Sequence, residues 1–168
     1  MRGVRGVAVA AAILVLLGAC DRAADEEETV PDETPAPDLA ERPDLATILP
    51  DEPGAPPDDL VIDDVVPGDG EEARAGDVVT AQYVGVSWST QEQFDASWDR
   101  GQPLTFPLGE GRVIEGWDRG LEGMRVGGRR VLIIPPELGY GDRGVEGVIA
   151  PGETLVFVVD LLEVEASR

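Results

Sequence analysis

Short apolar runs alternate with turn residues after residue 60, which is the pattern of a domain built mainly from strands. The clearest strand is predicted over residues 78–88, where Val79, Ala81 and Tyr83 fall on one face. The same signals predict further extended segments at residues 60–66, 93–97, 103–108, 129–134 and 154–164. Glycine- and proline-containing turns separate these segments, so we expect them to pair mostly in antiparallel fashion.

One segment, residues 113–121, has helical rather than strand periodicity. Val113, Ile114, Trp117 and Leu121 fall on one helical face, and glycines flank the segment. A helix this short is not stable alone in water, so its apolar face must pack against the strands. We therefore predict an α+β fold in which an antiparallel sheet of five to six strands curls around one short helix.

The N-terminus has the pattern of a targeting segment. Early arginines precede an apolar run that is too short to span a bilayer comfortably. The run ends in Leu17-Gly18-Ala19-Cys20, which resembles a bacterial lipobox. This predicts a lipoprotein signal peptide over residues 1–19 and a lipid on the thiol of Cys20.

An ordinary secretory signal with a chance cysteine is the alternative, but the only cysteine of the chain stands where the lipid would be attached. Two or more acyl chains anchor a protein stably. We expect the protein on the extracytoplasmic face of the cell membrane, with contact to the membrane through the lipid anchor only.

Residues 20–59 differ in composition from the rest of the chain. They are dense in Asp, Glu, Pro and Ala and contain no aromatic residue. Such a segment buries too little apolar surface to offset its chain entropy. We predict a disordered acidic tether that separates the membrane from a domain at residues 60–168. Binding of a basic partner or of cations is the alternative use of this charge.

Composition excludes several function classes. The net charge is −21, with 34 acidic and 13 basic residues, so the chain lacks the cations that neutralise nucleic-acid phosphates. There is no histidine and one cysteine, which excludes Ser-His-Asp and Cys-His nucleophilic schemes, a thiolate zinc site and an internal disulfide. We expect no metal, no cofactor and no nucleic-acid partner, and we expect a monomer.

All eight aromatic residues lie in the predicted domain. They are Tyr83, Trp88, Phe94, Trp98, Phe106, Trp117, Tyr140 and Phe157. Tyr83 and Phe157 face inward on predicted strands, Trp117 lies on the predicted helix, and Tyr140 stands between two glycines in a loop. This distribution predicts that several rings converge on one pocket.

An ordered series of short motifs then identifies a family resemblance. The motifs are Tyr83-Val84-Gly85, Phe94-Asp95-Ala96-Ser97, Phe106-Pro107-Leu108-Gly109, Val113-Ile114-Glu115-Gly116-Trp117-Asp118, Gly139-Tyr140-Gly141, Ile149-Ala150-Pro151 and Thr154-Leu155-Val156-Phe157. In this order and spacing they resemble the FKBP-type peptidyl-prolyl cis-trans isomerases over roughly residues 60–165. The fold of that family, a sheet curled around one short helix, agrees with the pattern above.

The resemblance implies a role for each matching residue. Trp117 would be the floor under the substrate proline, the Tyr140 hydroxyl and the Ile114 N–H would bind substrate carbonyls, and Asp95 would be the charged group near the twisting amide. The substrate-binding set would be Tyr83, Phe94, Leu104, Phe106, Val113, Ile114, Ile149 and Phe157. Leu104 stands where the family often has an aromatic ring, and Val145 stands where vertebrate members carry a histidine.

Each role has a plain alternative. Trp117, Ile149 and Phe157 can be ordinary core residues, Asp95 a turn or cap residue, and Tyr140 an exposed loop ring. We predict an isomerase that acts without a covalent step on X-Pro bonds of exported or surface proteins, with proline-containing polypeptides as substrates and macrolides such as tacrolimus as candidate ligands. The alternatives are a proline-peptide binding module or chaperone with little activity, and a structural envelope protein.

Overall fold

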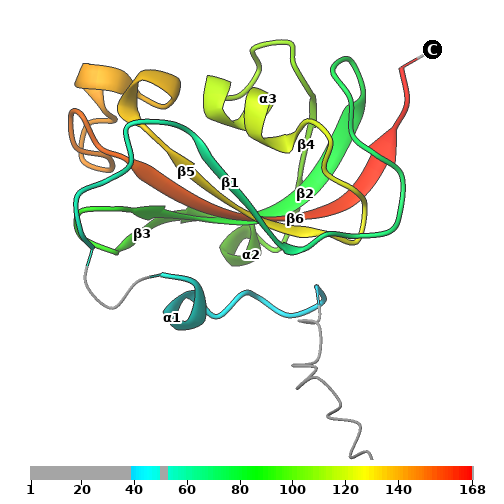
Figure 1. Ribbon diagram of the computed structural model, residues 1–168, viewed down its shortest axis with the longest axis horizontal. Coiled ribbons are helices and arrows are strands. Elements are labelled where there is room, and N and C mark those ends of the chain that lie inside the picture. The colour runs from blue at the N-terminus through cyan, green and yellow to red at the C-terminus, as the bar shows by residue number, and fades with distance from the viewer. Residues whose placement is uncertain (1–38, 50–52, 168) are drawn as a thin grey trace, which may run out of the picture. The chain divides into compact units, whose positions relative to one another are not determined.

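A six-stranded antiparallel sheet is the frame of the computed structural model, which describes residues 39–49 and 53–167. The elements are α1 (Leu45–Ile48), β1 (Val61–Val66), β2 (Val78–Ser87), β3 (Gln93–Ala96), α2 (Ser97–Arg100), β4 (Leu104–Pro107), α3 (Glu115–Leu121), β5 (Arg129–Ile134), 3-10 helices at Pro136–Leu138 and Gly141–Arg143, and β6 (Leu155–Glu165). The strand order is β1-β5-β6-β2-β3, and β4 also pairs with β2. The predicted α+β fold, an antiparallel sheet with a short helix, is confirmed (Figure 1).

Two short strands pair with the same edge of β2, one after the other. Residues 78–81 pair with β4, and residues 84–86 pair with β3. The other edge of β2 pairs along its whole length with β6. Side chains from β2, β3, β4 and β6 can therefore reach the same region of one sheet face.

Helix α3 lies on one face of the sheet, here called the inner face (Figure 1). Its Trp117 and Leu121 are buried in the main apolar cluster. Two glycines allow the helix to approach β5 closely. A Cβ atom at Gly116 would lie 2.7 Å from Ile134 Cδ1, and one at Gly120 would lie 2.7 Å from Leu132 Cδ2. Gly120 is thus a packing residue inside the helix rather than its end.

Helix α3 begins at Glu115, two residues later than the periodicity predicted. Ile114 is extended and acts as the N-cap, and its carbonyl accepts the Trp117 N–H at 2.9 Å. The preceding loop is bound by Asp118, whose carboxylate accepts the N–H groups of Gly109 and Gly111 at 2.8 and 2.9 Å. Satisfying these loop donors holds the chain extended before the helix.

A second short helix, α2, follows β3 where the sequence predicted only an extended segment. Ser97 begins it, and Gly101 ends it in the left-handed conformation with φ 66°. The buried Ser97 hydroxyl accepts the Tyr83 N–H at 2.8 Å. A helix of four residues has too few positions to show helical periodicity, which is why the pattern did not indicate it.

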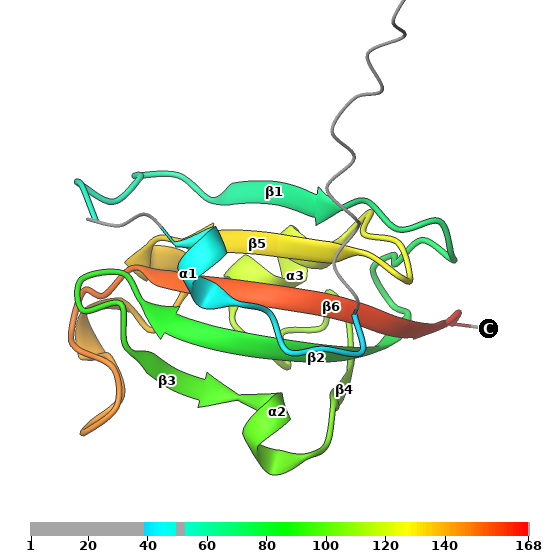
Figure 2. The same cartoon turned by 90° about the horizontal axis from the view of Figure 1, so that it is seen from below.

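The opposite, outer face of the sheet is also apolar. Its buried side chains are Val84, Val86, Ala96, Val131, Val156 and Val158. Leu45, Ile48 and Leu49 from the α1 segment pack against them, and Figure 2 shows α1 over this face. Residues 39–49, part of the segment predicted to be a disordered tether, thus have a place on this face, where the three apolar side chains are partly buried. Residues 1–38, with the predicted signal peptide and Cys20, lie outside the described part.

Within the described ranges, no helix is long and apolar enough to cross a bilayer.

Substitution of Gly116 by alanine tests the close contact of α3 with β5. Ile134 is fully buried and β-branched, so it cannot move away easily from the added methyl group. We expect the free energy of unfolding to fall by about 1–2 kcal/mol, because overpacking outweighs the gain of roughly 1 kcal/mol in helix propensity. Urea unfolding measures this change. Arg119→Ala, on the exposed side of the same helix, should cost much less; equal losses would contradict the packing role of Gly116.

Candidate active site

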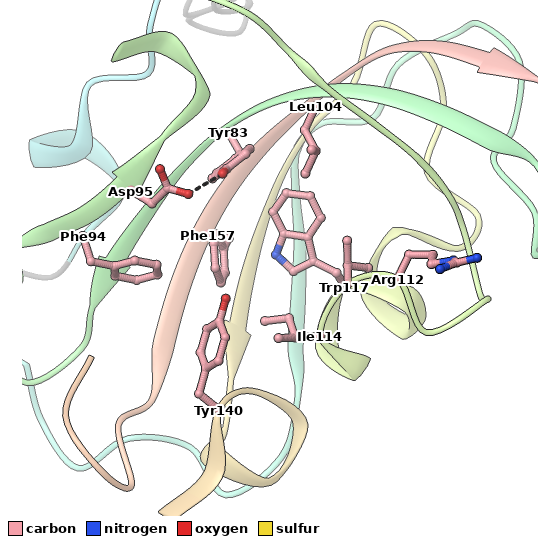
Figure 3. Close-up of a pocket in the computed structure, with 10 residues that line it drawn as sticks. Tyr83, Phe94, Asp95, Leu104, Arg112, Ile114, Trp117, Tyr140 and Phe157 are labelled. Carbon is pink, nitrogen blue, oxygen red and sulfur yellow. Dashed lines mark hydrogen bonds between the residues drawn. The ribbon is translucent and has the colours of Figure 1, made fainter. Parts of the chain in front are cut away.

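Side chains from β2, β3, β4, α3 and β6 converge on a cavity of about 180 Å³ between the helix and the inner face of the sheet. Its lining consists of Tyr83, Phe94, Asp95, Leu104, Arg112, Val113, Ile114, Trp117, Tyr140 and Phe157 (Figure 3). Most of these side chains are apolar or aromatic. The cavity therefore offers apolar and aromatic walls together with polar groups from Tyr83, Asp95, Arg112 and Tyr140.

The Trp117 indole lies at the bottom of this cavity and is 3% exposed. Its ring centroid lies 5.1 Å from that of Tyr83, 5.2 Å from that of Phe157 and 5.6 Å from that of Phe106. The indole N–H has no hydrogen-bond partner among the described residues. The Phe157 ring stands at 89° to the indole, and the nitrogen points toward it in Figure 3. This edge-to-face contact gives the N–H an aromatic face in place of an oxygen acceptor.

Gly85 makes room for two of the rings. It lies opposite Phe157 in the β2–β6 register. A Cβ atom there would lie 2.7 Å from the Phe94 ring and 2.8 Å from the Phe157 ring. The absence of a side chain allows Phe94 and Phe157 to meet at 5.5 Å in a T-shaped contact. Glycine at this position therefore shapes one wall of the cavity.

The charged wall of the cavity is a closed group of three side chains. The Tyr83 hydroxyl donates to one Asp95 oxygen, and Arg100 donates to the other. Arg100 also donates to the Tyr83 hydroxyl at 2.7 Å, and its guanidinium lies 5.4 Å from the centroid of that ring. Both Asp95 oxygens are thus occupied and its charge is balanced. The two partners orient the Asp95 carboxylate on this side of the cavity.

The two tyrosines of the site keep their protons. Burial raises the pKa of Tyr83, the hydrogen bond to Asp95 raises it further, and Arg100 opposes both effects. Burial also raises the pKa of Tyr140, with a further contribution from the Asp95 charge. Both groups ordinarily titrate near pH 10, so both hydroxyls remain donors throughout the neutral range.

Two hydrogen-bond donors at the rim have no partner among the described residues. The Tyr140 hydroxyl points into the cavity (Figure 3), and the Ile114 N–H precedes the first turn of α3. Donors without partners beside an apolar cavity suit a ligand that carries carbonyl groups, because a buried carbonyl requires a donor.

Nine of the eleven predicted catalytic and substrate-binding residues line this cavity, and Phe106 and Ile149 do not. Phe106 packs against Trp117 as part of the core and supports the floor. Ile149 is a buried core residue whose backbone pairs with that of Val145. Both side chains are buried in the main cluster, so the cavity surface is formed by other residues.

Arg100 and Arg112 belong to the site but were not predicted. Arg112 lies exposed at the rim, with its guanidinium turned away from the cavity (Figure 3). Arg100 reaches Asp95 only because α2 turns the chain back, and the sequence did not indicate that helix. Trp88 is not part of the cavity: its indole packs on the outer cluster and donates to the Gly54 carbonyl at 3.0 Å.

The described residues contain no group of three or more His, Cys, Asp or Glu side chains arranged to hold a metal ion. The groups that line the cavity can enclose, orient and hydrogen-bond a ligand, and none of them is an activated nucleophile.

Several known proteins are similar to this chain. A family model described as "FKBP-type peptidyl-prolyl cis-trans isomerase" matches residues 69–162. A Streptomyces anulatus "FK506-binding protein" is 62% identical over 112 residues, which is 66% of this chain and 90% of that protein. A Corynebacterium glutamicum "Probable FK506-binding protein" is 53% identical over 109 residues, 65% of this chain and 90% of that protein.

Solved structures are similar as well. The crystal structure of AtFKBP13 superimposes with a TM-score of 0.59 at 42% identity and covers 64% of this chain and 93% of that one. The crystal structure of FkpA from Escherichia coli gives the same TM-score at 43% identity, over 65% of this chain and 49% of that one.

Substitution of Gly85 by alanine tests how the wall of the cavity is built. The added methyl group must displace the Phe94 and Phe157 rings. We expect the free energy of unfolding to fall by about 1–3 kcal/mol and the ring-current-shifted NMR signals of Phe157 and Trp117 to move. Gly54→Ala is the control, since nothing lies within 4 Å of a Cβ atom there. Unchanged aromatic signals in the Gly85 variant would refute the spacing role.

Proposed function

The chain belongs to the FKBP-type peptidyl-prolyl cis-trans isomerase family, and from this premise we propose that it isomerises X-Pro bonds of exported or surface-exposed proteins in the cavity over Trp117. The observation that carries the proposal is the combination of an aromatic floor with two donors at the rim, Ile114 N–H and Tyr140 hydroxyl. A proline ring is apolar, while the amides on either side of it need hydrogen bonds. The cavity supplies a matching surface for both.

The chemistry follows from the nature of the barrier. Rotation about an X-Pro bond is slow because the amide is conjugated, with a barrier of about 18–20 kcal/mol. The planar amide is more polar than the twisted one, so a dry cavity disfavours the planar ground state. Donors that hold the neighbouring carbonyls can favour the twisted geometry. No bond to the protein forms or breaks in this scheme.

Asp95 contributes as part of the Tyr83–Asp95–Arg100 group. The Arg100–Asp95 ion pair is about half exposed, with side-chain exposures of 48% and 41%, so its contribution to folding stability is small. The ion pair holds the Tyr83 ring in place and determines the electrostatic potential on one side of the cavity. An uncompensated charge at this place would attract water into the apolar space.

The place of action is inferred from the N-terminus. The Leu17-Gly18-Ala19-Cys20 motif supports processing to a lipoprotein with a lipid on Cys20. The domain would then work at the extracytoplasmic face of the cell membrane, where newly exported chains fold. Residues 20–38 would form the first part of the tether. This part of the proposal rests on sequence alone.

Macrolide binding is a second proposal for the same cavity. Relatives from two bacteria bear the name "FK506-binding protein", and FK506 is the macrolide tacrolimus. Leu104 forms one wall with an aliphatic side chain in place of a ring. It keeps that wall apolar but offers less surface to the ligand, so we expect tacrolimus to bind with reduced affinity.

A prolyl-isomerisation assay on a short X-Pro peptide tests the function of the full chain. We expect clear acceleration over the uncatalysed rate, and inhibition by tacrolimus. Trp117→Leu should lower kcat/KM by about tenfold or more, because the floor that orients the proline is lost. Asp95→Ala should lower it less steeply, since only one wall is rearranged.

Asp63→Ala is the matched control for Asp95→Ala, because Asp63 is an exposed carboxylate on β1 outside the cavity lining. A peptide that binds without any acceleration would leave a binding module or chaperone as the function. Equal activities of the Asp63 and Asp95 variants would remove Asp95 from the mechanism.

Mass spectrometry of the mature protein, isolated from membranes, tests the anchor. We expect the chain to begin at Cys20 and to carry the mass of an attached diacylglycerol. A Cys20→Ser variant should no longer be found in the membrane fraction. A mature chain that begins elsewhere, or an unmodified cysteine, would leave only an ordinary secretory signal.

A further inference from the structure

The outer face of the sheet, opposite the cavity, is covered by residues 39–49, which we call the strap. It lies outside residues 69–162, the part that matches the family model. Within the strap, Asp44 caps α1 by accepting the Ala46 N–H at 3.0 Å, and the Leu49 N–H returns to the Leu45 carbonyl at 2.9 Å. The strap therefore has a defined local conformation.

Apolar contacts and one buried polar contact attach the strap to the sheet. Leu45, Ile48 and Leu49 pack on the valines of the outer cluster. Beside them, Arg129 and Asp160 form a buried ion pair, with exposures of 5% and 1%. Arg129 Nη2 also donates to the Glu41 carbonyl of the strap at 3.0 Å. The strap thus satisfies a donor of a buried guanidinium, which favours one position on the sheet.

Arg42 connects the strap to the segment formed by β3 and α2. It donates to Asp99 at 2.6 Å and also to the side-chain oxygen of Gln93. The Gln93 amide in turn donates to the second Asp99 oxygen at 2.7 Å, so the three side chains form a closed ring of hydrogen bonds. The bonds from Gln93 and Arg42 lower the pKa of the Asp99 carboxyl, so it is ionised at neutral pH. A guanidinium can make both contacts at once, whereas a lysine offers a single point charge.

The segment between Gln93 and Asp99 carries the charged wall of the cavity. Phe94 and Asp95 line the cavity directly, and Arg100 follows Asp99 and binds Asp95 and Tyr83. Gln93 and Asp99 are the two ends of this segment, and Arg42 holds both from the opposite side of the molecule. In the described part of the chain, β3 pairs with β2, and the Ser97 hydroxyl at the start of α2 accepts the Tyr83 N–H of β2. Arg42 adds an attachment on the side of the segment away from β2.

We propose that Arg42 is a positioning residue for the isomerase site: the strap holds the β3–α2 segment through Gln93 and Asp99 and so sets the geometry of Phe94, Asp95 and Arg100. The inference rests on the proposed function of the cavity. It assigns a part in the reaction to a segment N-terminal to the family domain. The strap also brings the chain to the sheet face that lies away from the cavity, which leaves the cavity open to substrate.

The test compares full-length variants at a temperature at which all of them are folded. We expect Arg42→Ala to lower kcat/KM by about threefold to tenfold, because the charged wall loses its fixed position. Amide hydrogen exchange at residues 93–100 should rise by about tenfold, while exchange in the centre of β6 stays unchanged. Arg42→Lys should lie between wild type and Arg42→Ala, since it can keep one of the two contacts.

Arg125→Ala is the matched control. Arg125 pairs with Glu72 at 2.7 Å with similar exposure, 47% against 40% for Arg42, and lies outside the cavity lining. It should leave kcat/KM and the exchange at residues 93–100 unchanged. If Arg42 acts through Asp99, then Asp99→Ala and the double variant should show about the same loss as Arg42→Ala alone.

Removal of the strap contacts gives an independent measurement. Leu45→Ser combined with Ile48→Ser should lower kcat/KM and raise exchange at residues 93–100 as Arg42→Ala does. Ala46→Ser, on the exposed side of α1, should change neither quantity. Equal behaviour of Arg42→Ala and Arg125→Ala, or additive losses in the Arg42–Asp99 double variant, would overturn the proposal. A wild-type chain without isomerase activity would instead refute the proposed function, and the exchange measurements would still decide whether the strap orders residues 93–100.

Discussion

The apolar character of both sheet faces is the constraint on which the structure depends. Along β2, Tyr83 and Gly85 face the inner side, while Val84 and Val86 face the outer side. An antiparallel sheet commonly leaves one face to water, but here burial of apolar area favours a cover on each face. Helix α3 covers the inner face, and the strap with Trp88 and Trp98 covers the outer face. Helix α3 forms part of the site, and the strap attaches the N-terminal segment to the domain.

The cavity exists because a seven-residue helix is too short to cover the whole inner face. Gly116 and Gly120 bring α3 against β5, and aromatic rings from β2, β3 and β6 fill much of the remaining space around Trp117. What is left is a small apolar space with polar groups at one wall. These charges are paired with one another, because an isolated charge beside an apolar cavity would be costly to desolvate.

Local patterns predicted the frame, and the family resemblance supplied the set of site residues. Period-2 alternation indicated the strands, and the spacing of Trp117 and Leu121 indicated helix α3. The aromatic residues were identified as a converging set, and Phe94, Trp117, Tyr140 and Phe157 do line one cavity. Phe106 was included in the substrate-binding set, but its ring lies behind the floor. Sequence could not separate a ring that lines the cavity from one that supports it from behind, since both are apolar and inward-facing.

The sequence by itself determined the class of fold, the inward face of the strand at residues 78–88, and the presence of several inward-facing rings, because these depend on local periodicity and residue type. Only the tertiary structure decided that residues 39–49 pack on the outer face, that Arg100 pairs with Asp95, and that Arg42 binds Asp99 from 57 positions away. The physical reason is that each of these contacts joins surfaces that exist only after the sheet has formed. A four-residue helix such as α1 and a single arginine carry no periodic signal, and their binding partners come together only in the folded domain.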